Sequence, residues 1–314
     1  MLRLLLILAV LGANHATNRP IIGIITQPMD NTVNQYQYDT YIAASYVKFL
    51  ELAGARVMPI WLNQTTDYYR RVVKYTNGVL FPGGSAPFDT PGGYGEAARE
   101  IYKLAVEAND QGIYYPLWGT CLGFEVLPFA ETGIDLRVSC LMEEVGIPLD
   151  FVPGFKDSRM YQEIPDHLVD ILVEENVTFN YHELCFTRQS MYQHGALKWR
   201  TLSTNIDSNG LNFISSFEHE DYPFYGVQFH PEKPIFEFKE GVGIPHTVDS
   251  IQVAQYYSNF FVNEARKNDN AFPNSTAAVQ SLIYNFCASF TAVNNSYYFQ
   301  SYGFHESDYS NLLI

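Results

Sequence analysis

Ile113-Tyr-Tyr-Pro-Leu-Trp-Gly-Thr-Cys-Leu-Gly123 is the stretch of this chain that decides its fold. Its first half is an apolar run long enough for a buried strand, and apolar residues at helical spacing follow it. A strand, a tight Gly-x-Cys-x-Gly turn and a helix together form a nucleophile elbow, in which the glycines permit a turn that side chains would obstruct. The elbow places Cys121 at a helix N-terminus, where backbone N–H groups and the helix dipole favour a thiolate. A buried structural cysteine is the alternative, because unpaired Cys is among the most buried residue types.

Predicted strands and helices alternate around this elbow. Apolar runs predict strands at residues 20–26, 56–60 and 78–81, and periodic segments predict helices at 40–53 (with Asp39 as its cap), 67–75 and 94–111. Continuous apolar strands are typical of parallel sheets that are buried on both faces. The alternation therefore predicts an α/β fold with a doubly wound, mostly parallel sheet and helices on both faces.

The second half of the chain is less regular. Strands are predicted at 168–172, 211–217 and 222–228, and a strong helix at 250–265. Residues 268–314 are rich in aromatic residues, Asn and Ser, and we interpret them as an irregular extension packed on the domain. Residues 17–314 are thus expected to form one domain, which their number allows.

The first residues have the pattern of a secretory signal peptide. Residues 1–16 contain one basic residue, a short apolar run and small residues, and the run is too short to span a bilayer. An uncleaved anchor is the alternative. Four Asn-x-Ser/Thr sites, at Asn63, Asn176, Asn274 and Asn294, then predict a glycoprotein of the secretory pathway.

The charge of the chain limits its possible partners. The net charge of −15 argues against nucleic acid or an anionic membrane surface as a partner. It allows an anionic small substrate, for which Lys233 is a candidate contact.

If Cys121 is a nucleophile, at most one disulfide can form among Cys140, Cys185 and Cys287, and the pairing stays open. The chain contains no C-x-x-C pair, so a zinc site is not expected.

A second motif follows the predicted strand 222–228. His230 comes just past the strand's carboxyl end, where open α/β sheets carry their sites, and Glu232 can approach the imidazole from behind. With Cys121 these residues form a Cys–His–Glu triad for acyl transfer to the thiol and hydrolysis of the thioester.

Backbone N–H groups beside the triad are expected to bind the oxyanion of this reaction. The N–H of Leu122 adjoins the nucleophile, and a second donor is expected from Gly83 or Gly84 in the loop after strand 78–81. An ordinary surface turn is the alternative for that loop. His182 is a further candidate for the cleft, although such a His is more often structural.

Two stretches carry a resemblance to a known family. Gly119-Thr-Cys-Leu-Gly-Phe-Glu125 and Gln228-Phe-His-Pro-Glu-Lys233 resemble the class I glutamine amidotransferase-like (flavodoxin-like) superfamily and, within it, more closely the γ-glutamyl hydrolase family. The resemblance implies that Cys121 is the nucleophile, His230 the base and Glu232 its orienting partner. Glu125 shares a position of the elbow motif and either binds substrate or braces the elbow.

The resemblance also implies a substrate and a setting. The family cleaves γ-glutamyl amide bonds of polyglutamated folates and antifolates, in lysosomes and outside cells, without metal or cofactor and commonly as a homodimer. Three alternatives remain. One is a glutaminase subunit that supplies ammonia to a synthase, which the signal peptide argues against. The others are a γ-glutamyl-binding pseudoenzyme, which the complete triad argues against, and a γ-glutamyl amine hydrolase with a small leaving group.

Overall fold

An eight-stranded sheet forms the centre of the protein in the computed structural model, which describes residues 17–29, 38–292 and 296–311. Five of its strands are parallel, in the order β4 (Arg56–Ile60), β1 (Ile21–Ile25), β5 (Val79–Phe81), β6 (Leu117–Thr120) and β12 (Phe224–Val227). Three antiparallel strands complete it: β11 (Asn212–His219), β10 (Trp199–Ile206) and β8 (Asp150–Phe151). The predicted doubly wound, mostly parallel sheet is therefore confirmed, with an antiparallel part at one edge.

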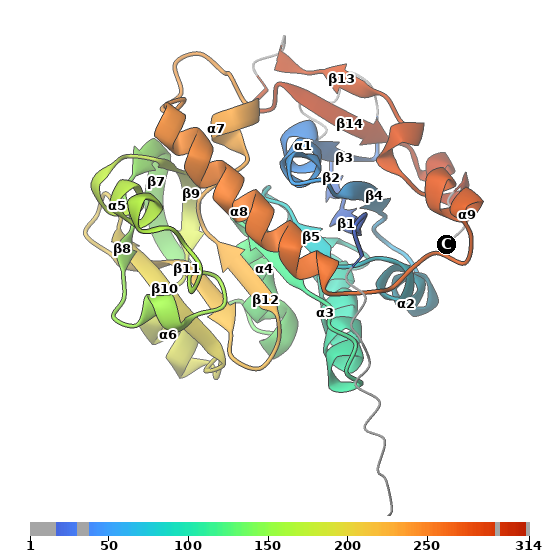
Figure 1. Cartoon of the computed structure of the whole chain (residues 1–314), viewed down its shortest axis with the longest axis horizontal. Coiled ribbons are helices and arrows are strands. Elements are labelled where there is room, and N and C mark those ends of the chain that lie inside the picture. The colour runs from blue at the N-terminus through green and yellow to red at the C-terminus, as the bar shows by residue number, and fades with distance from the viewer. Residues whose placement is uncertain (1–16, 30–37, 293–295, 312–314) are drawn as a thin grey trace, which may run out of the picture.

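Helices cover both faces of this sheet. The chain crosses from β1 to β4 through α1 (Ala44–Leu52) and returns to β5 through α2 (Thr66–Tyr75), so right-handed crossovers place these two helices on opposite faces. On the first face α1 packs against α8 (Val248–Arg266), which runs diagonally across the front of the sheet in Figure 1. On the second face α3 (Tyr94–Asp110) contacts α2 and α4 (Leu122–Thr132). Every residue of β1 and β6 is buried, as this double covering requires.

Two sequence-based assignments were wrong. Residues 40–43, which we predicted as the start of a helix, form strand β3 (Thr40–Ala43), because β14 (Gln300–Phe304) pairs with them from the far end of the chain. Helix α1 accordingly begins after Ala43, not after Asp39. The predicted strand at 168–172 belongs to helix α5 (Asp166–Glu174), in which Leu168 and Leu172 bury one face at a spacing of four residues.

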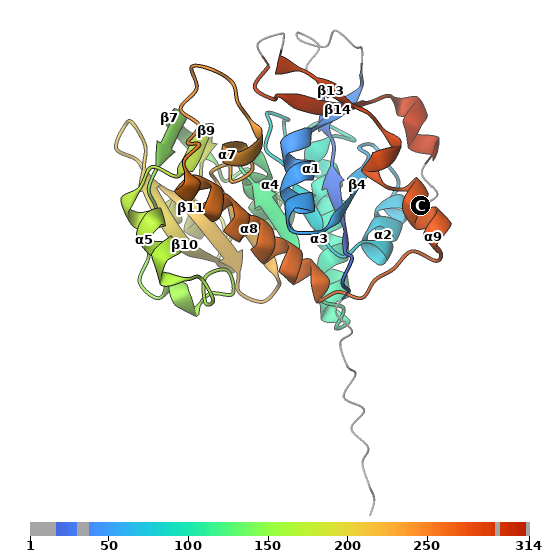
Figure 2. The same ribbon diagram turned by 45° about the horizontal axis from the view of Figure 1, so that its top comes forward.

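The C-terminal extension is more regular than its sequence indicated. It contains α9 (Ser275–Gln280), β13 (Ala288–Phe290) and β14, and a second sheet has the order β13-β14-β3-β2, with β2 at Gln27–Pro28. This sheet lies over α1 in Figure 2. Trp61 fixes the extension to the main sheet, because its indole packs against the rings of Phe304 and Tyr309 with centroids 4.8 Å away in both cases.

A separate antiparallel pair is formed by β7 (Val138–Ile147) and β9 (Thr178–Cys185). It lies at the same end of the molecule as the sheet of β13 and β14, on the opposite side (Figure 1). A disulfide joins Cys140 of β7 to Cys185 of β9. This settles the pairing that the sequence left open, and Cys287 remains as an exposed thiol. The short helices α6 (Arg188–Gln193) and α7 (Lys233–Phe236) complete the α-helices of the described residues.

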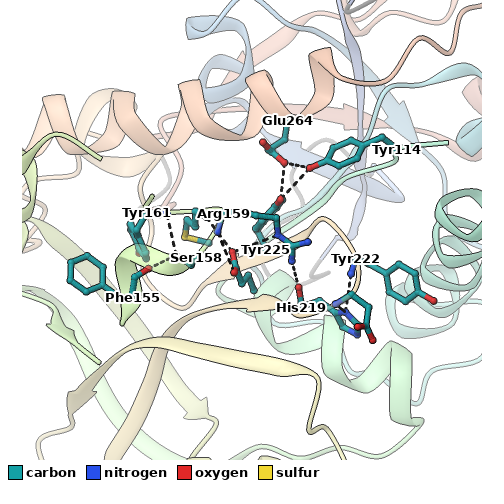
Figure 3. Close-up of polar contacts among 12 residues, drawn as sticks. Tyr114, Phe155, Ser158, Arg159, Tyr161, His219, Tyr222, Tyr225 and Glu264 are labelled. Atoms are coloured by element: carbon teal, nitrogen blue, oxygen red, sulfur yellow. Dashed lines mark hydrogen bonds and ion pairs between the residues drawn. The ribbon is translucent and has the colours of Figure 1, made fainter. Parts of the chain in front are cut away.

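A buried polar network lies at the end of the sheet where the parallel strands begin (Figure 3). The carboxylate of Glu264, on α8, accepts hydrogen bonds from the hydroxyl groups of Tyr114 and Tyr225, the latter at 2.7 Å. These tyrosines lie just before β6 and at the start of β12, so the network attaches the end of α8 to the beginnings of two central strands. Nearby, the Arg159 guanidinium donates to the carbonyl of His219.

Two predictions concern the surface and the beginning of the chain. Asn63, Asn176 and Asn274 have exposed side chains, whereas Asn294 and the predicted signal peptide, residues 1–16, lie outside the described residues. Glycosylation and secretion therefore stay predictions. Within residues 17–29, 38–292 and 296–311, no helix is long and apolar enough to cross a membrane.

Candidate active site

Cys121 occupies the elbow that the sequence predicted. It connects β6 to α4 with a φ of 54° and a ψ of −113°, a conformation that is strained for a residue with a side chain. Both flanking glycines are required by close packing, because a Cβ on Gly119 would lie 2.2 Å from the Gly123 carbonyl oxygen and one on Gly123 only 1.8 Å from that of Phe81. The elbow therefore aims the thiol past the carboxyl end of the parallel strands, although only 6% of the residue is exposed.

The electrostatic surroundings of the thiol differ from the expectation that it is a thiolate. Burial raises the pKa of Cys121, and the nearby Glu125 carboxylate raises it further, whereas a hydrogen bond from the Leu122 N–H lowers it. Desolvation outweighs the helix N-terminus here, because the thiol is enclosed by protein on most sides. The thiol, whose Sγ lies 3.9 Å from the Tyr181 carbonyl oxygen, is thus neutral at rest and needs a base.

His230 is placed to be that base. It follows the end of β12, and its backbone N–H donates a 2.8 Å hydrogen bond to the Phe179 carbonyl on β9. Its Nδ1 lies 2.7 Å from Glu232 Oε1, and both side chains are almost fully buried. Burial lowers the pKa of His230, while Glu232 raises it, so the imidazole is neutral and ready to accept a proton on Nε2.

The Gly83 position brings the imidazole and the thiol together. A Cβ at Gly83 would lie 2.9 Å from His230 Cε1 and 3.2 Å from Cys121 Cβ, so both functional groups adjoin the same stretch of backbone. Its N–H donates a 2.9 Å hydrogen bond to the hydroxyl oxygen of Tyr46, which lies 3.4 Å from His230 Nδ1. Tyr46 had no signal in the sequence beyond its place on the apolar face of a helix.

The two remaining candidate donors face a cavity. Gly84 and Leu122 line this cavity together with Cys121 and His230, and its volume is about 840 Å³. Of the predicted oxyanion donors, the Gly83 N–H donates to the Tyr46 hydroxyl, so Gly84 is the loop glycine that we expect to act with Leu122.

The cavity has walls that sequence reasoning did not find. One wall comes from β9, through residues 181–184, and another from the C-terminal extension, through Ser289, Thr291, 296–298, Ser301 and Gly303. Figure 1 shows the β7–β9 pair and the β13–β14 pair at opposite sides of the end of the sheet where these residues converge. Nothing in the composition of the extension indicated that it would contribute to a site near Cys121.

Glu125 lies in the cavity lining, on the first turn of α4. Its carboxylate accepts hydrogen bonds from Arg137 Nη1 at 3.1 Å and from Gln228 Nε2 at 2.9 Å. Burial nevertheless raises the pKa of Glu125 to about 7, against the lowering effect of Arg137. The structure therefore brings Glu125 beside the nucleophile and also makes it part of a buried network that braces the elbow.

His182 also lines the cavity, but most of it is enclosed. Its Nε2 lies 3.2 Å from Asn180 Oδ1, and its Nδ1 lies 3.5 Å from Cys140 Sγ. Burial lowers the pKa of His182 to about 3, and the neighbouring His230 lowers it as well. A neutral, anchored imidazole of this kind can contact a substrate without competing as a base.

Lys233 supplies positive charge to the cavity. Its Nζ lies 5.0 Å from the ring centroid of Tyr298 and 5.7 Å from that of Phe179, and the side chain is only 3% exposed. A buried ammonium group that faces a cavity is suited to bind a carboxylate. The described residues contain no group of three or more His, Cys, Asp or Glu side chains that could hold a metal ion.

Comparison with known proteins agrees with this geometry. The sequence profile of the Peptidase C26 family matches residues 20–232, which contain Cys121, His230 and Glu232. The chain therefore belongs to this family of cysteine peptidases.

Its relatives carry a more particular name. The chain is 41% identical to the human γ-glutamyl hydrolase over 281 residues, which cover 89% of this chain and 88% of the human protein. It is 40% identical to the rat γ-glutamyl hydrolase over 292 residues, 92% of this chain and 91% of the rat protein. It is 36% identical to γ-glutamyl hydrolase B of Dictyostelium discoideum, over 88% of this chain and 81% of that protein.

Proposed function

We propose that this protein is a cysteine-type γ-glutamyl hydrolase that cleaves the γ-glutamyl amide bonds of folate and antifolate polyglutamates. The observation that carries the proposal is the buried pair of His230 and Glu232, 2.7 Å apart, which adjoins Cys121 at the carboxyl end of the parallel strands. The similarity to γ-glutamyl hydrolases over most of the chain supports γ-glutamyl as the acyl group of the substrate.

The reaction begins with proton transfer from the Cys121 thiol to His230 Nε2. Glu232 accepts the Nδ1–H hydrogen bond, holds the required tautomer and stabilises the imidazolium that forms. The sulfur attacks the γ-carbonyl carbon, and the N–H groups of Leu122 and Gly84 bind the oxyanion. Collapse of this intermediate breaks the C–N bond, and His230 returns the proton to the leaving amine. Water, activated by the same imidazole, then hydrolyses the thioester.

Charge in the cavity supports an anionic substrate. Although the whole chain carries a net charge of −15, Lys233 places a buried ammonium group in the lining of the cavity. We assign Lys233 to a substrate carboxylate and Glu125 to the substrate's polar groups, with His182 as a further contact. The small-molecule substrate requires no cofactor in this mechanism.

The setting completes the proposal. A signal peptide at residues 1–16, exposed sequons and one disulfide are consistent with a secreted or lysosomal glycoprotein. The homodimer that the family resemblance implies is a further part of the proposal.

A product assay tests the reaction. Purified protein is incubated at acidic pH with a folate pentaglutamate and, separately, with free glutamine. We expect shortened folates and free glutamate, and their loss in Cys121→Ala with substrate binding retained. Cys287→Ala is the matched control, because Cys287 is the exposed free thiol and should leave turnover unchanged. Ammonia from glutamine with the folate untouched would contradict the proposal and indicate a glutaminase.

A further inference from the structure

Three side chains form a continuous stack at the rim of the cavity. The rings of Tyr181, on β9, and Tyr297, in the C-terminal extension, are stacked with centroids 5.1 Å apart and an interplanar angle of 28°. Their hydroxyl groups are 3.1 Å apart. The Nζ of Lys239 lies 3.7 Å from the centroid of Tyr297. Tyr297 therefore contacts both Lys239 and Tyr181.

The Tyr181 end of this stack lines the cavity. Tyr297 contacts both Lys239 and Tyr181, whereas Tyr181 has one ring partner among the described residues, Tyr297. Both tyrosines line the cavity, and each is more than a third exposed (36% and 38%), whereas Tyr298 beside them is half-buried. The backbone carbonyl of Tyr181 is the group that the Cys121 thiol contacts, so this ring belongs to the residue next to the reacting sulfur.

We propose that Tyr181 is a specificity-determining residue that stacks on an aryl group joined through an amide carbonyl to the α-amino nitrogen of the γ-glutamyl unit, with Tyr297 and Lys239 holding it in position. This inference rests on the proposed γ-glutamyl hydrolase activity. Folates have such a group, because an aminobenzoyl ring is joined to the first glutamate. Offset stacking between aromatic rings stabilises a complex by an amount that corresponds to about 3- to 10-fold in affinity.

The C-terminal extension gains a role from this inference. Tyr297 lies beyond residue 232, where the match to the Peptidase C26 profile ends, so the element that positions Tyr181 lies outside the part of the chain that carries the triad. The catalytic residues thus come from the parallel sheet, and the aryl selectivity comes from the contact between β9 and the extension.

Two substrates with the same scissile bond test the proposal. One is 4-aminobenzoyl-γ-glutamyl-glutamate, and the other is N-acetyl-γ-glutamyl-glutamate, in which acetyl replaces the aminobenzoyl group. For Tyr181→Ala we expect KM for the aryl substrate to rise about 3- to 10-fold, with KM for the acetyl substrate and both kcat values within about twofold of the wild type. Tyr181→Phe keeps the ring and should behave as the wild type with both substrates.

Further variants separate stacking from a structural effect. Tyr297→Ala should raise KM for the aryl substrate only, because it frees Tyr181 without removing it. Tyr192→Ala is the matched control, since Tyr192 is 74% exposed on α6 and is not part of the cavity lining. Equal changes with both substrates, or no change with either, would overturn the inference. Absence of cleavage by the wild-type enzyme would instead contradict the proposed function.

Binding measured in Cys121→Ala gives an independent readout that does not need turnover. Calorimetric titration with the aryl substrate should show about 3- to 10-fold weaker binding when Tyr181→Ala is added to this background. Titration with the acetyl substrate should show the same affinity in both. Equal affinities for the aryl substrate with and without Tyr181 would refute the stack as a binding site.

Discussion

Replacing Glu232 with glutamine removes the negative charge that lies 2.7 Å from His230 Nδ1 while it preserves the size of the side chain. The charge is nearly unscreened, because Glu232 is 1% exposed and His230 4%. In the resting enzyme His230 is neutral, so the charge matters most when the thiol proton arrives and the imidazolium forms. Removing the charge therefore destabilises the transition state more than the folded ground state.

The size of the effect follows from this burial. Removing one partner of a buried ion pair costs about 3–5 kcal/mol. Since each ~1.4 kcal/mol of barrier is a factor of about ten in rate, kcat should fall by about 10²- to 10⁴-fold. A glutamine amide can also donate to Nδ1 and stabilise the wrong tautomer, which acts in the same direction. KM should change little, because Glu232 lies behind the imidazole and not in the cavity lining.

Glutamate release from a folate diglutamate, measured from pH 4 to pH 8, gives kcat and KM for the variant. Thermal unfolding followed by circular dichroism checks that it is folded. Glu264→Gln is the matched control, because this buried carboxylate belongs to the network at the opposite end of the strands (Figure 3). It should lower thermal stability and leave kcat of the folded enzyme within about twofold. A Glu232→Gln enzyme with kcat within about threefold of the wild type would refute the assignment of Glu232 as orienting partner.

Three further predictions follow from the packing and electrostatics of the site. Burial holds the folded-state pKa of Glu125 at about 7, above its ordinary value of 4.5, so the stability it contributes is present below pH 4.5 and is lost as pH rises through 7. Glu125→Gln should therefore flatten the pH dependence of urea unfolding in this window by about 3 kcal/mol, and parallel profiles would contradict this. Gly83→Ala places a methyl group 2.6 Å from the Tyr46 hydroxyl oxygen and 2.9 Å from His230 Cε1, so these buried groups must shift, and kcat/KM should fall about 100-fold; unchanged kinetics would contradict this. Removing the disulfide by the double change Cys140→Ala and Cys185→Ala should lower the free energy of unfolding by about 2–5 kcal/mol in urea titration, and an unchanged midpoint would argue that the bond adds nothing to stability.

The sequence by itself determined the parallel part of the central sheet and indicated thiol chemistry. Strands β1, β4 and β5 could be predicted from continuous apolar runs, because a strand buried on both faces must be apolar throughout. The Gly-x-Cys-x-Gly turn is legible because backbone atoms approach both glycines too closely for any side chain. Cys121 and His230 could be placed at one edge because the carboxyl ends of parallel strands meet there.

Local pattern was insufficient where a distant partner or an ambiguous period decided the structure. Residues 40–43 have helical spacing, yet pairing with residues 301–304 makes them a strand, and no local signal reports a partner that far along the chain. The short apolar run at 168–172 fits both the spacing of a strand and that of a helix. Only the surface against which it packs makes it a helix.

Only the tertiary structure decided the cavity and the electrostatics. The helix N-terminus at Cys121 indicated a thiolate, but burial dominates and keeps the thiol neutral, and burial depends on what the whole chain packs around the elbow. Tyr46, Tyr181 and Tyr297 read as core or loop residues in the sequence. They reach the site because α1, β9 and the C-terminal extension converge on it. Contacts between segments more than a hundred residues apart leave no period in the sequence, and therefore only folding reveals them.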